Sequence, residues 1–370
     1  MENQKQADRE KVLEMKDLSI SFKTSAGEIK AIRGVDFTLY RGDTVAIVGE
    51  SGSGKSVTVK AIMGILSGNQ TVNSGTIIYS YPLDGKMIHE DLLKTSKKEM
   101  RKRINGRRIA MVFQDPMTSL NPTMTVGAQV MEGMIYHHNK TKDEARKKAI
   151  HLLELVGITD PEKRMKNYPH QLSGGMRQRI VIAIALSCDP EILICDEPTT
   201  ALDVTIQAKI LELIREIQKK LNISVIYITH DLGVVAKVAD YVAVMYAGRF
   251  VEKGTTEEIF FDPRHPYTWG LLSAMPSIKD GKESLYAIPG SPPNLLNKVQ
   301  GDPFAERNLY AMNIDFRKEP PMFKITDTHY AATWLLHENA PKVDMPKQLR
   351  GRIQKMLEEV EQNGRKNAVT

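Results

Sequence analysis

The sequence predicts an α/β fold in which short buried strands alternate with helices, and three observations lead to that prediction. Apolar runs of strand length recur, each followed at once by polar residues: Thr44–Val48, Ile109–Phe113, Glu191–Cys195 and Ser224–Ile228. Helix-start signals lie between them, such as the capping box that opens at Thr141 and closes at Glu144. One glycine-rich segment, residues 49–56, lies directly between a strand and a predicted helix.

That glycine-rich segment fits the phosphate-binding pattern G-x-x-x-x-G-K-[ST]. Its residues are Gly49, Glu50, Ser51, Gly52, Ser53, Gly54, Lys55 and Ser56. Its backbone N–H groups would surround a triphosphate at the N-terminus of the next helix, predicted over Val57–Leu66. Lys55 is expected to contact the β- and γ-phosphates, and Ser56 to hold Mg²⁺. The alternative is a chance glycine-rich turn, which the strand before it and the helix after it disfavour.

The composition is that of a globular protein large enough for two or three domains. The chain has 370 residues, of which 41% are apolar and 26% charged. No apolar run reaches the length of about 18 residues that a membrane span requires, and Met1–Lys11 lacks a signal-peptide core. The two cysteines, Cys188 and Cys195, fit a reduced cytosolic protein, and Cys195 is expected in the core. A net charge of +6 permits contact with nucleic acid or lipid and argues for neither.

An antiparallel β flap is expected before the nucleotide core. Val12–Phe22 and Ala31–Tyr40 read as strands joined by a turn near Ala26, and Gly75–Tyr81 reads as a further strand. Phe22 has two interpretations, stacking on an adenine ring or packing inside the flap, and its spacing alone favours packing.

The basic run Lys94–Arg108 also has two interpretations. It is either a nucleic-acid patch or a solvated helical face. No aromatic residue interleaves the charges, so no base-stacking platform is present, which favours the helical face.

Polar residues follow several core strands and are expected at one edge of the sheet, where open α/β folds bind ligands. They are Gln114, the pair Asp196 and Glu197, and His230. Two acids at a strand end in a phosphate-loop protein suggest Mg²⁺ binding and water activation. Val242–Tyr246 is expected to be the last core strand.

A mostly helical insert, from about residue 116 to 169, is expected between the core strands. After it, Ser173 is a good N-cap, and Gly174 and Gly175 leave an exposed helix N-terminus suited to an anion.

These elements occur in the order found in the ATP-binding cassette (ABC) transporter ATPases, which the sequence resembles across residues 12 to 250. The matching elements are Gly49–Ser56, Gln114, Leu172–Gln178, Ile192–Glu197, Asp203 and His230.

The resemblance implies ATP and Mg²⁺ as cofactors and ATP hydrolysis as the activity. Ser56 and Asp196 match the Mg²⁺ site, and Gln114 matches the loop that senses Mg²⁺ and the membrane subunit. Glu197 matches the carboxylate that polarises the attacking water, and His230 matches the γ-phosphate contact.

The resemblance also implies contacts to the nucleotide. Phe22 matches the aromatic residue that stacks on adenine, which replaces the packing interpretation. Residues 173–175 (Ser-Gly-Gly) match the signature that touches the γ-phosphate of a facing cassette, so a cassette dimer is implied. Asp203 matches the loop that crosses that dimer.

A more specific resemblance, up to about residue 345, is to the oligopeptide/dipeptide importers. The segments that carry it are Phe113–Pro122, Asp262–Thr268, Ile288–Pro293, Asp302–Asn308, Trp334–His337 and Ala340–Val343. It divides the chain into an ATP-binding domain (1–260), a peptide-importer C-terminal domain (261–345) and a charged tail (346–370), which reads as a helix with a frayed end.

The sequence departs from the family at four positions. Many relatives have cysteines there that resemble an iron–sulfur site, whereas this chain has Asp302, Asn308, Asp315 and Thr333. Because a [4Fe–4S] cluster requires thiolates and no cysteine follows Cys195, no iron–sulfur cluster is expected.

The resemblance implies an ATPase subunit that powers oligopeptide uptake from the cytoplasmic side of the cell membrane. The implied partners are a second, related cassette subunit, two transmembrane permease subunits contacted near Gln114–Gly133, and indirectly an extracytoplasmic peptide-binding protein. Nucleic acid is not an expected partner. Cargo within the subfamily stays open between oligopeptides, dipeptides, nickel and glutathione.

Two other functions fit the sequence less well. A non-transport cassette that acts on ribosomes or DNA usually carries two cassettes or a long coiled-coil insert, and this chain has neither. A non-enzymatic regulatory cassette is disfavoured because Lys55, Glu197 and His230 are intact.

Overall fold

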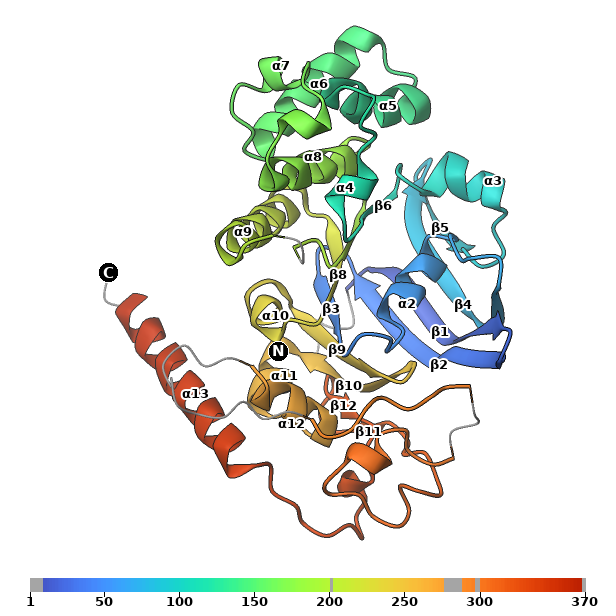
Figure 1. Cartoon of the computed structure of the whole chain (residues 1–370), viewed down its shortest axis with the longest axis vertical. Coiled ribbons are helices and arrows are strands. Elements are labelled where there is room, and N and C mark those ends of the chain that lie inside the picture. Colours follow the sequence, from blue (N-terminus) through green and yellow to red (C-terminus); the bar gives the residue numbers. More distant parts are fainter. Residues whose placement is uncertain (1–8, 200–201, 276–287, 297–299, 368–370) are drawn as a thin grey trace.

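The computed structural model describes residues 9–199, 202–275, 288–296 and 300–367. Its centre is an eight-stranded sheet in the order β11-β12-β10-β9-β3-β8-β7-β6 (Figure 1). Five of these strands form a parallel core: β6 (Ile109–Val112), β7 (Ile192–Asp196), β8 (Ser224–Thr229), β3 (Thr44–Val48) and β9 (Tyr241–Tyr246). The carboxyl ends of these strands therefore lie at one edge, which is where the polar residues predicted from the sequence follow them.

The prediction that Val242–Tyr246 is the last core strand is wrong. Ala247 and Gly248, both with positive φ (46° and 81°), turn the chain back into β10 (Arg249–Thr255), which pairs antiparallel with β9. Two short strands continue the sheet, β12 (Tyr330–Ala331) and β11 (Phe323–Lys324). The C-terminal region thus shares the central sheet with the nucleotide core.

A second sheet forms the predicted antiparallel flap, in the order β2-β1-β4-β5. Its strands are β1 (Lys11–Thr24), β2 (Gly27–Tyr40), β4 (Gln70–Leu83) and β5 (Lys86–Asp91). It packs beside α2 (Lys55–Ile62), the helix that follows the phosphate-binding loop (Figure 1). The basic run folds as α3 (Lys97–Glu99) and the π-helix η1 (Met100–Ile104), whose buried residues are the apolar Met100 and Ile104.

The predicted helical insert is present between β6 and β7, and it is drawn at the top of Figure 1. Its helices are α4 (Pro116–Ser119), α5 (Val126–His138), α6 (Lys142–Leu155), α7 (Pro161–Arg164) and the 3₁₀ turn η2 (Pro169–Gln171). The predicted capping box at Thr141 and Glu144 opens α6. The next helix, α8 (Gly174–Leu186), packs against α5 and α6 and leads into β7.

Further helices complete the chain. They are α9 (Val204–Leu221), α10 (Leu232–Val238), α11 (Thr256–Phe261), α12 (Pro266–Ser273), the 3₁₀ turns η3 (Ala305–Arg307) and η4 (Trp334–Leu336), and α13 (Lys347–Asn367). Helix α13 contacts α11 and α12 on the side of the molecule away from the flap (Figure 1).

Alternate residues of each core strand enter two separate hydrophobic clusters, one on each face of the sheet. On β3, Ala46 and Val48 pack toward the helices, whereas Val45 and Ile47 pack toward the flap and α2. This two-sided burial explains why the core strands read as continuous apolar runs. Cys195 is fully buried on the helix-facing side, as predicted. Across the described residues, each helix is too short or too polar to cross a bilayer.

Candidate active site

A cavity of about 560 Å³ lies at the carboxyl edge of the parallel strands. Its wall contains residues from the phosphate-binding loop, the flap and the ends of three core strands. Phe22 of β1 lines one side, and Gln114, Glu197 and His230 line another. The structure therefore brings together most of the residues predicted from the sequence.

Backbone geometry sets the shape of the phosphate-binding loop at its first glycine. Gly49 has a φ of 151°, and a Cβ atom there would lie 2.1 Å from the backbone oxygen of Met245. A side chain at this position would force the loop away from β9, so the tight exit from β3 requires glycine.

Lys55 is held inside the loop. Its Nζ donates hydrogen bonds to the carbonyl oxygens of Gly49 (2.8 Å) and Glu50 (2.9 Å), and its side chain is buried. Burial lowers the pKa of Lys55, while the carboxylates of Glu197 and Asp196 oppose that shift. The Lys55 ammonium has lost water on burial, and a bound phosphate would supply the negative charge that favours its charged form.

Ser56 and Asp196 form a pair of hard oxygen donors. Ser56 Oγ donates to Asp196 Oδ1 at 3.0 Å, and Asp196 is buried at the end of β7. Burial raises the pKa of Asp196, and the Ser56 hydroxyl acts against that shift. A hydroxyl and a carboxylate fit Mg²⁺, which prefers oxygen ligands and takes only one or two carboxylates beside phosphates and water.

Glu197 lies between Gln114 and His230. Gln114 Nε2 donates to Glu197 Oε2 at 3.1 Å, and His230 Nδ1 lies 3.3 Å from Glu197 Oε1. Glu197 has a φ of 47°, a left-handed conformation uncommon for residues other than glycine. Its backbone N–H bonds to Ile228 on β8, which fixes this turn. A strained backbone that aims a carboxylate into a cavity is typical of functional sites.

The remaining predicted site residues lie elsewhere. Ser173 caps α8 by accepting a hydrogen bond from the N–H of Met176, and Asp203 caps α9 in the same way through Ile206. Gly175 approaches the same Ile206 so closely that a Cβ atom would lie 2.9 Å from it. Ser173 and Asp203 are exposed, and residues 173–175 and 203 do not line the described cavity. Within one chain, the loop and the signature are therefore separate.

Comparison with known proteins agrees with this geometry. Residues 32–200 match the ABC transporter family model, and residues 251–314 match the model of the oligopeptide/dipeptide transporter C-terminal region. The chain is 58% identical to the oligopeptide transport ATP-binding protein OppD of Bacillus subtilis over 349 residues, covering 94% of this chain and 95% of the relative. The chain belongs to the ABC transporter ATP-binding proteins. A second relative, the dipeptide transport ATP-binding protein DppD of Lactococcus lactis, is 54% identical over 90% of this chain and 93% of its own.

Solved structures with the same fold include other cassettes of this family. A dimeric ATP-binding cassette in a post-hydrolysis state with ADP and phosphate has a TM-score of 0.57 and 26% identity, and covers 66% of this chain and 98% of its own. A Clostridium perfringens cassette that is part of an ABC transporter complex has the same TM-score and 33% identity. The match covers 68% of this chain and 92% of that cassette. The predictions of family, α/β fold and ATPase activity are therefore confirmed.

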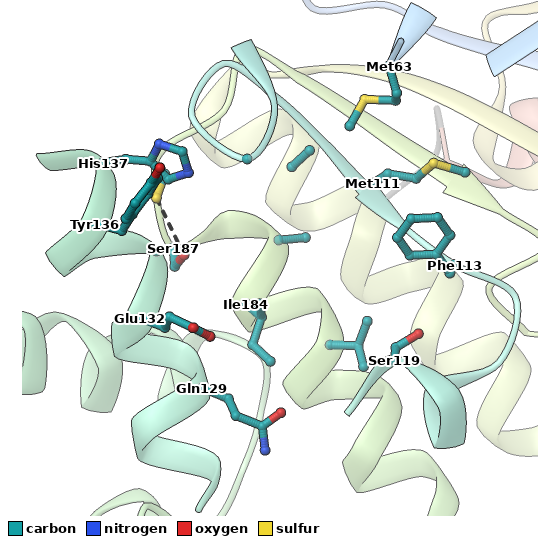
Figure 2. A pocket seen from close by; sticks show the side chains of 16 residues that line it. Met63, Met111, Phe113, Ser119, Gln129, Glu132, Tyr136, His137, Ile184 and Ser187 are labelled. Atoms are coloured by element: carbon teal, nitrogen blue, oxygen red, sulfur yellow. Dashed lines mark hydrogen bonds between the residues drawn. The ribbon is translucent and has the colours of Figure 1, made fainter. Parts of the chain in front are cut away.

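The cassette has a second large cavity, of about 550 Å³, between the helical insert and the sheet (Figure 2). Its lining includes Gln129, Glu132 and Tyr136 of α5, Ile184 of α8 and Phe113 after β6. Phe113 and Tyr136 are exposed large apolar side chains, and Figure 2 shows them on opposite sides of the opening. An opening that exposes aromatic rings is suited to a protein partner.

The four positions that replace cysteines are all buried: Asp302, Asn308, Asp315 and Thr333. Each accepts a backbone N–H from a nearby residue, respectively those of Phe304, Tyr310, Met312 and Leu335. The described residues contain no group of three or more His, Cys, Asp or Glu side chains that could hold a metal ion. The absence of an iron–sulfur cluster stays a prediction.

Three residues of the C-terminal region at the nucleotide site were missed by the sequence analysis. Leu295 lines the cavity, and Tyr267 and Arg307 bond to Glu50. Arg307 lies in Asp302–Asn308, one of the segments that resemble the peptide importers, but neither its spacing nor its residue type indicates a contact with the loop.

Proposed function

We propose that this cassette binds ATP with Mg²⁺ in the 560 Å³ cavity, hydrolyses it, and powers the import of peptides. The observation that carries this proposal is the convergence of Lys55, the Ser56–Asp196 pair and the Glu197–Gln114 pair on one cavity. The cargo class is taken from the relatives, which are named as oligopeptide and dipeptide transport proteins. Oligopeptides are the proposed cargo, and dipeptides are the second candidate.

Each residue has a proposed part in the reaction. Phe22 stacks on the adenine ring, and residues 49–56 hold the phosphates, with Lys55 on the β- and γ-phosphates. Ser56 and Asp196, assisted by Gln114, hold Mg²⁺, which neutralises phosphate charge when it is bound. This division fits a reaction that depends on positioning and charge stabilisation more than on covalent chemistry.

Glu197 is the proposed general base. Its carboxylate polarises the attacking water and accepts its proton, while Gln114 and His230 orient the carboxylate from opposite oxygens. His230 also contacts the γ-phosphate. His230 and Glu197 line the same cavity, in which the attacking water and the γ-phosphate are proposed to lie.

The active form is a dimer of cassettes. Residues 173–175 are proposed to contact the γ-phosphate on a facing subunit, and Asp203 to lie at the same interface. Their exposure and their separation from this chain's own cavity support that arrangement. The facing subunit is proposed to be a second, related cassette, so each chain completes the other's site.

Two permease subunits hold the pair of cassettes on the cytoplasmic side of the membrane. We propose that a permease segment enters the cavity lined by α5, α8 and Phe113, with Gln114 beside it as the link to the nucleotide (Figure 2). An extracytoplasmic peptide-binding protein acts through the permeases. The proposed division of the chain is an ATP-binding domain (1–260, helical part about 116–169), a C-terminal domain (261–345) and a tail (346–370).

The test is purification from membranes together with peptide uptake by cells that depend on this chain. The unaltered chain should retain two permeases and a second cassette, and Lys55→Ala should retain them without supporting uptake. Tyr136→Arg should lose the permeases yet still bind ATP, whereas Leu83→Arg, an exposed apolar residue of the flap, should behave as the unaltered chain. Iron and sulfide analysis of the same preparation, made anaerobically, should find neither. Peptide uptake that continues when this chain is removed would contradict the import role. Crosslinks from Ser173 that form only between two copies of this chain would contradict the pairing with a second, related cassette.

A further inference from the structure

The C-terminal region reaches the phosphate-binding loop through one arginine. Arg307, at the end of η3, forms a bidentate ion pair with Glu50, with Nη1–Oε2 at 2.6 Å and Nη2–Oε1 at 2.9 Å. Arg307 Nε donates to the carbonyl of Pro289 at 2.8 Å, and the Arg307 side chain is only 5% exposed. Each nitrogen of the guanidinium thus donates a hydrogen bond, and its position is fixed from the C-terminal side.

Glu50 is also held through its backbone. Its N–H donates to the hydroxyl of Tyr267 on α12 at 2.9 Å. Tyr267 is fully buried and packs against the rings of Tyr246 and Phe304, with ring centroids 4.6 and 5.3 Å away. The second residue of the loop is therefore held at two points, by Arg307 and by a tyrosine of a buried aromatic cluster.

The same residue holds Lys55. The carbonyl of Glu50 accepts a hydrogen bond from Lys55 Nζ at 2.9 Å. A continuous set of bonds therefore runs from Arg307 through Glu50 to the lysine that faces the phosphates.

We propose that Arg307 is a positioning residue of the ATP site, which acts through Glu50 on the phosphate-binding loop. The inference rests on the proposed ATP site. Arg307 acts in two ways. It holds the loop in its binding conformation before ATP arrives, which reduces the ordering cost of binding. It also neutralises the Glu50 carboxylate, which would otherwise repel the polyphosphate at close range.

The experiment measures ATP binding by the full chain and ATPase kinetics of the assembled transporter. Arg307→Gln is expected to raise the Kd and KM for ATP about tenfold and to change kcat less than about twofold, because ground-state binding is what it loses. Arg307→Lys keeps the positive charge without the planar fork, so its KM for ATP should lie between those of the unaltered chain and Arg307→Gln. Glu50→Gln combined with Arg307→Gln should bind ATP more tightly than Arg307→Gln alone, because the unpaired carboxylate is then absent.

The matched control is Glu319→Gln. Glu319 anchors the same C-terminal region by ion pairs with Arg33 (3.0 Å) and Arg249 (2.8 Å), and neither pair touches the loop. This variant should leave the KM for ATP unchanged even if it lowers the thermal midpoint.

Three results would overturn the proposal: an unchanged KM in Arg307→Gln, an equal rise in KM in Glu319→Gln, or a double variant no better than Arg307→Gln. If Arg307→Gln does not fold, Arg307→Lys is compared with the unaltered chain, and an unchanged KM in Arg307→Lys overturns the proposal. Failure of the proposed ATP site would appear differently, as an unaltered chain that binds no ATP.

Discussion

Two buried aspartates in different regions of the chain have the same exposed fraction but different surroundings. Asp196 at the end of β7 and Asp302 in the C-terminal region are each 7% exposed, and burial raises the pKa of both carboxyls. Asp196 accepts from the Ser56 hydroxyl beside an open cavity, whereas Asp302 accepts from the backbone N–H of Phe304 within its own turn. A buried carboxylate thus indicates a ligand site only where its partners leave space for a ligand.

The same contrast holds for the two regions as wholes. The nucleotide site depends on regular strands, whose ends bring Lys55, Glu197 and His230 together. Beyond α12, the described C-terminal region has two strands of two residues each and short helical turns before α13. It holds its shape through side chains that bond to backbone groups. Substitutions in the first region should therefore change mainly ATP turnover, and substitutions in the second should change mainly the free energy of unfolding.

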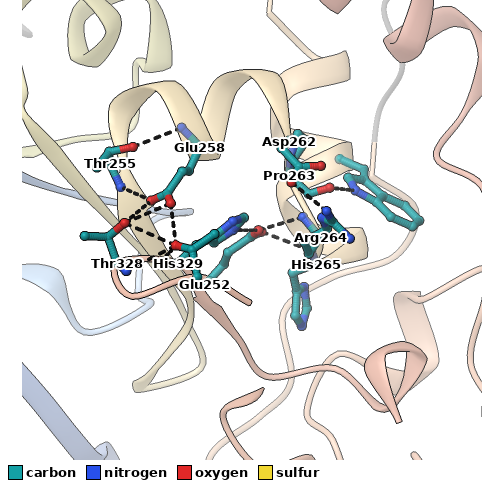
Figure 3. Close-up of polar contacts among 11 residues, drawn as sticks. Glu252, Thr255, Glu258, Asp262, Pro263, Arg264, His265, Thr328 and His329 are labelled. Carbon is teal, nitrogen blue, oxygen red and sulfur yellow. Dashed lines mark hydrogen bonds and ion pairs between the residues drawn. The ribbon is translucent and has the colours of Figure 1, made fainter. Parts of the chain in front are cut away.

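The largest expected effect is on stability, at a buried network that joins Glu252 of β10 to the C-terminal region (Figure 3). Glu252 is fully buried, accepts the backbone N–H groups of Arg264 (2.6 Å) and His265 (3.0 Å), and lies 2.8 Å from His329 Nε2. Glu252→Ala leaves these donors unpaired and should lower the free energy of unfolding by about 4 kcal/mol. Denaturant titration measures it, with the exposed Glu257→Ala as control. A loss no larger than that of the control would mean that the network does not hold the region.

The next effect is chemical. Glu197→Gln keeps the size of the side chain and removes the base, so it should retain ATP binding and lower turnover of the assembled transporter at least about 10²-fold, or about 2.7 kcal/mol. Glu216→Gln, an exposed acid on α9, is the control. Steady-state ATPase rates measure the turnover, and nucleotide titration measures the ATP binding. Near-normal turnover in Glu197→Gln would remove this residue from the role of base.

The sequence predicted which strand-end residues gather at this cavity because local patterns dictate it. Each catalytic candidate follows an apolar run, and parallel strands must bring their carboxyl ends to one edge. The loop, its helix and the cap at Ser173 are likewise set by neighbours in sequence.

The C-terminal contacts were not predictable in this way. Glu50 and Arg307 are 257 positions apart, and no periodicity links them. The continuation of the sheet past Val242–Tyr246 was missed for a related reason. Strand β10 contains Glu252, a charged residue that is fully buried because partners from other segments satisfy it, so the run does not read as a core strand.

A smaller effect depends on pH. Burial raises the pKa of Asp302 to about 7, whereas an unfolded aspartate titrates near pH 4, so the folded chain binds more protons between these values. The free energy of unfolding should therefore fall as pH rises from about 4 to about 7. Asp302→Asn keeps the acceptor for the Phe304 N–H and removes this dependence. It should stabilise the chain by about 2 kcal/mol at about pH 8 and by much less at about pH 4. Thermal midpoints at both pH values measure the difference, and equal gains at both would contradict the shift.

The smallest expected effect tests whether the two regions are separate at all. Leu295 belongs to the C-terminal region but lines the nucleotide cavity with Phe22, and its apolar side chain is partly exposed to that space. Because Phe22 and Leu295 line the same cavity, Leu295 is expected to contact an adenine ring that stacks on Phe22. Leu295→Ala removes that contact and should raise the Kd for ATP about threefold, or about 0.7 kcal/mol, with no change in kcat. The control is Leu309→Ala, an exposed leucine of the same region that lies outside the cavity lining. Titration with ATP and with inorganic triphosphate separates the base from the phosphates, because only ATP should bind more weakly. An equal loss of affinity for ATP and for triphosphate would mean that Leu295 acts on the phosphate-binding loop and not on the adenine ring. The contacts to Glu50 would then be the only ones by which the C-terminal region affects ATP binding.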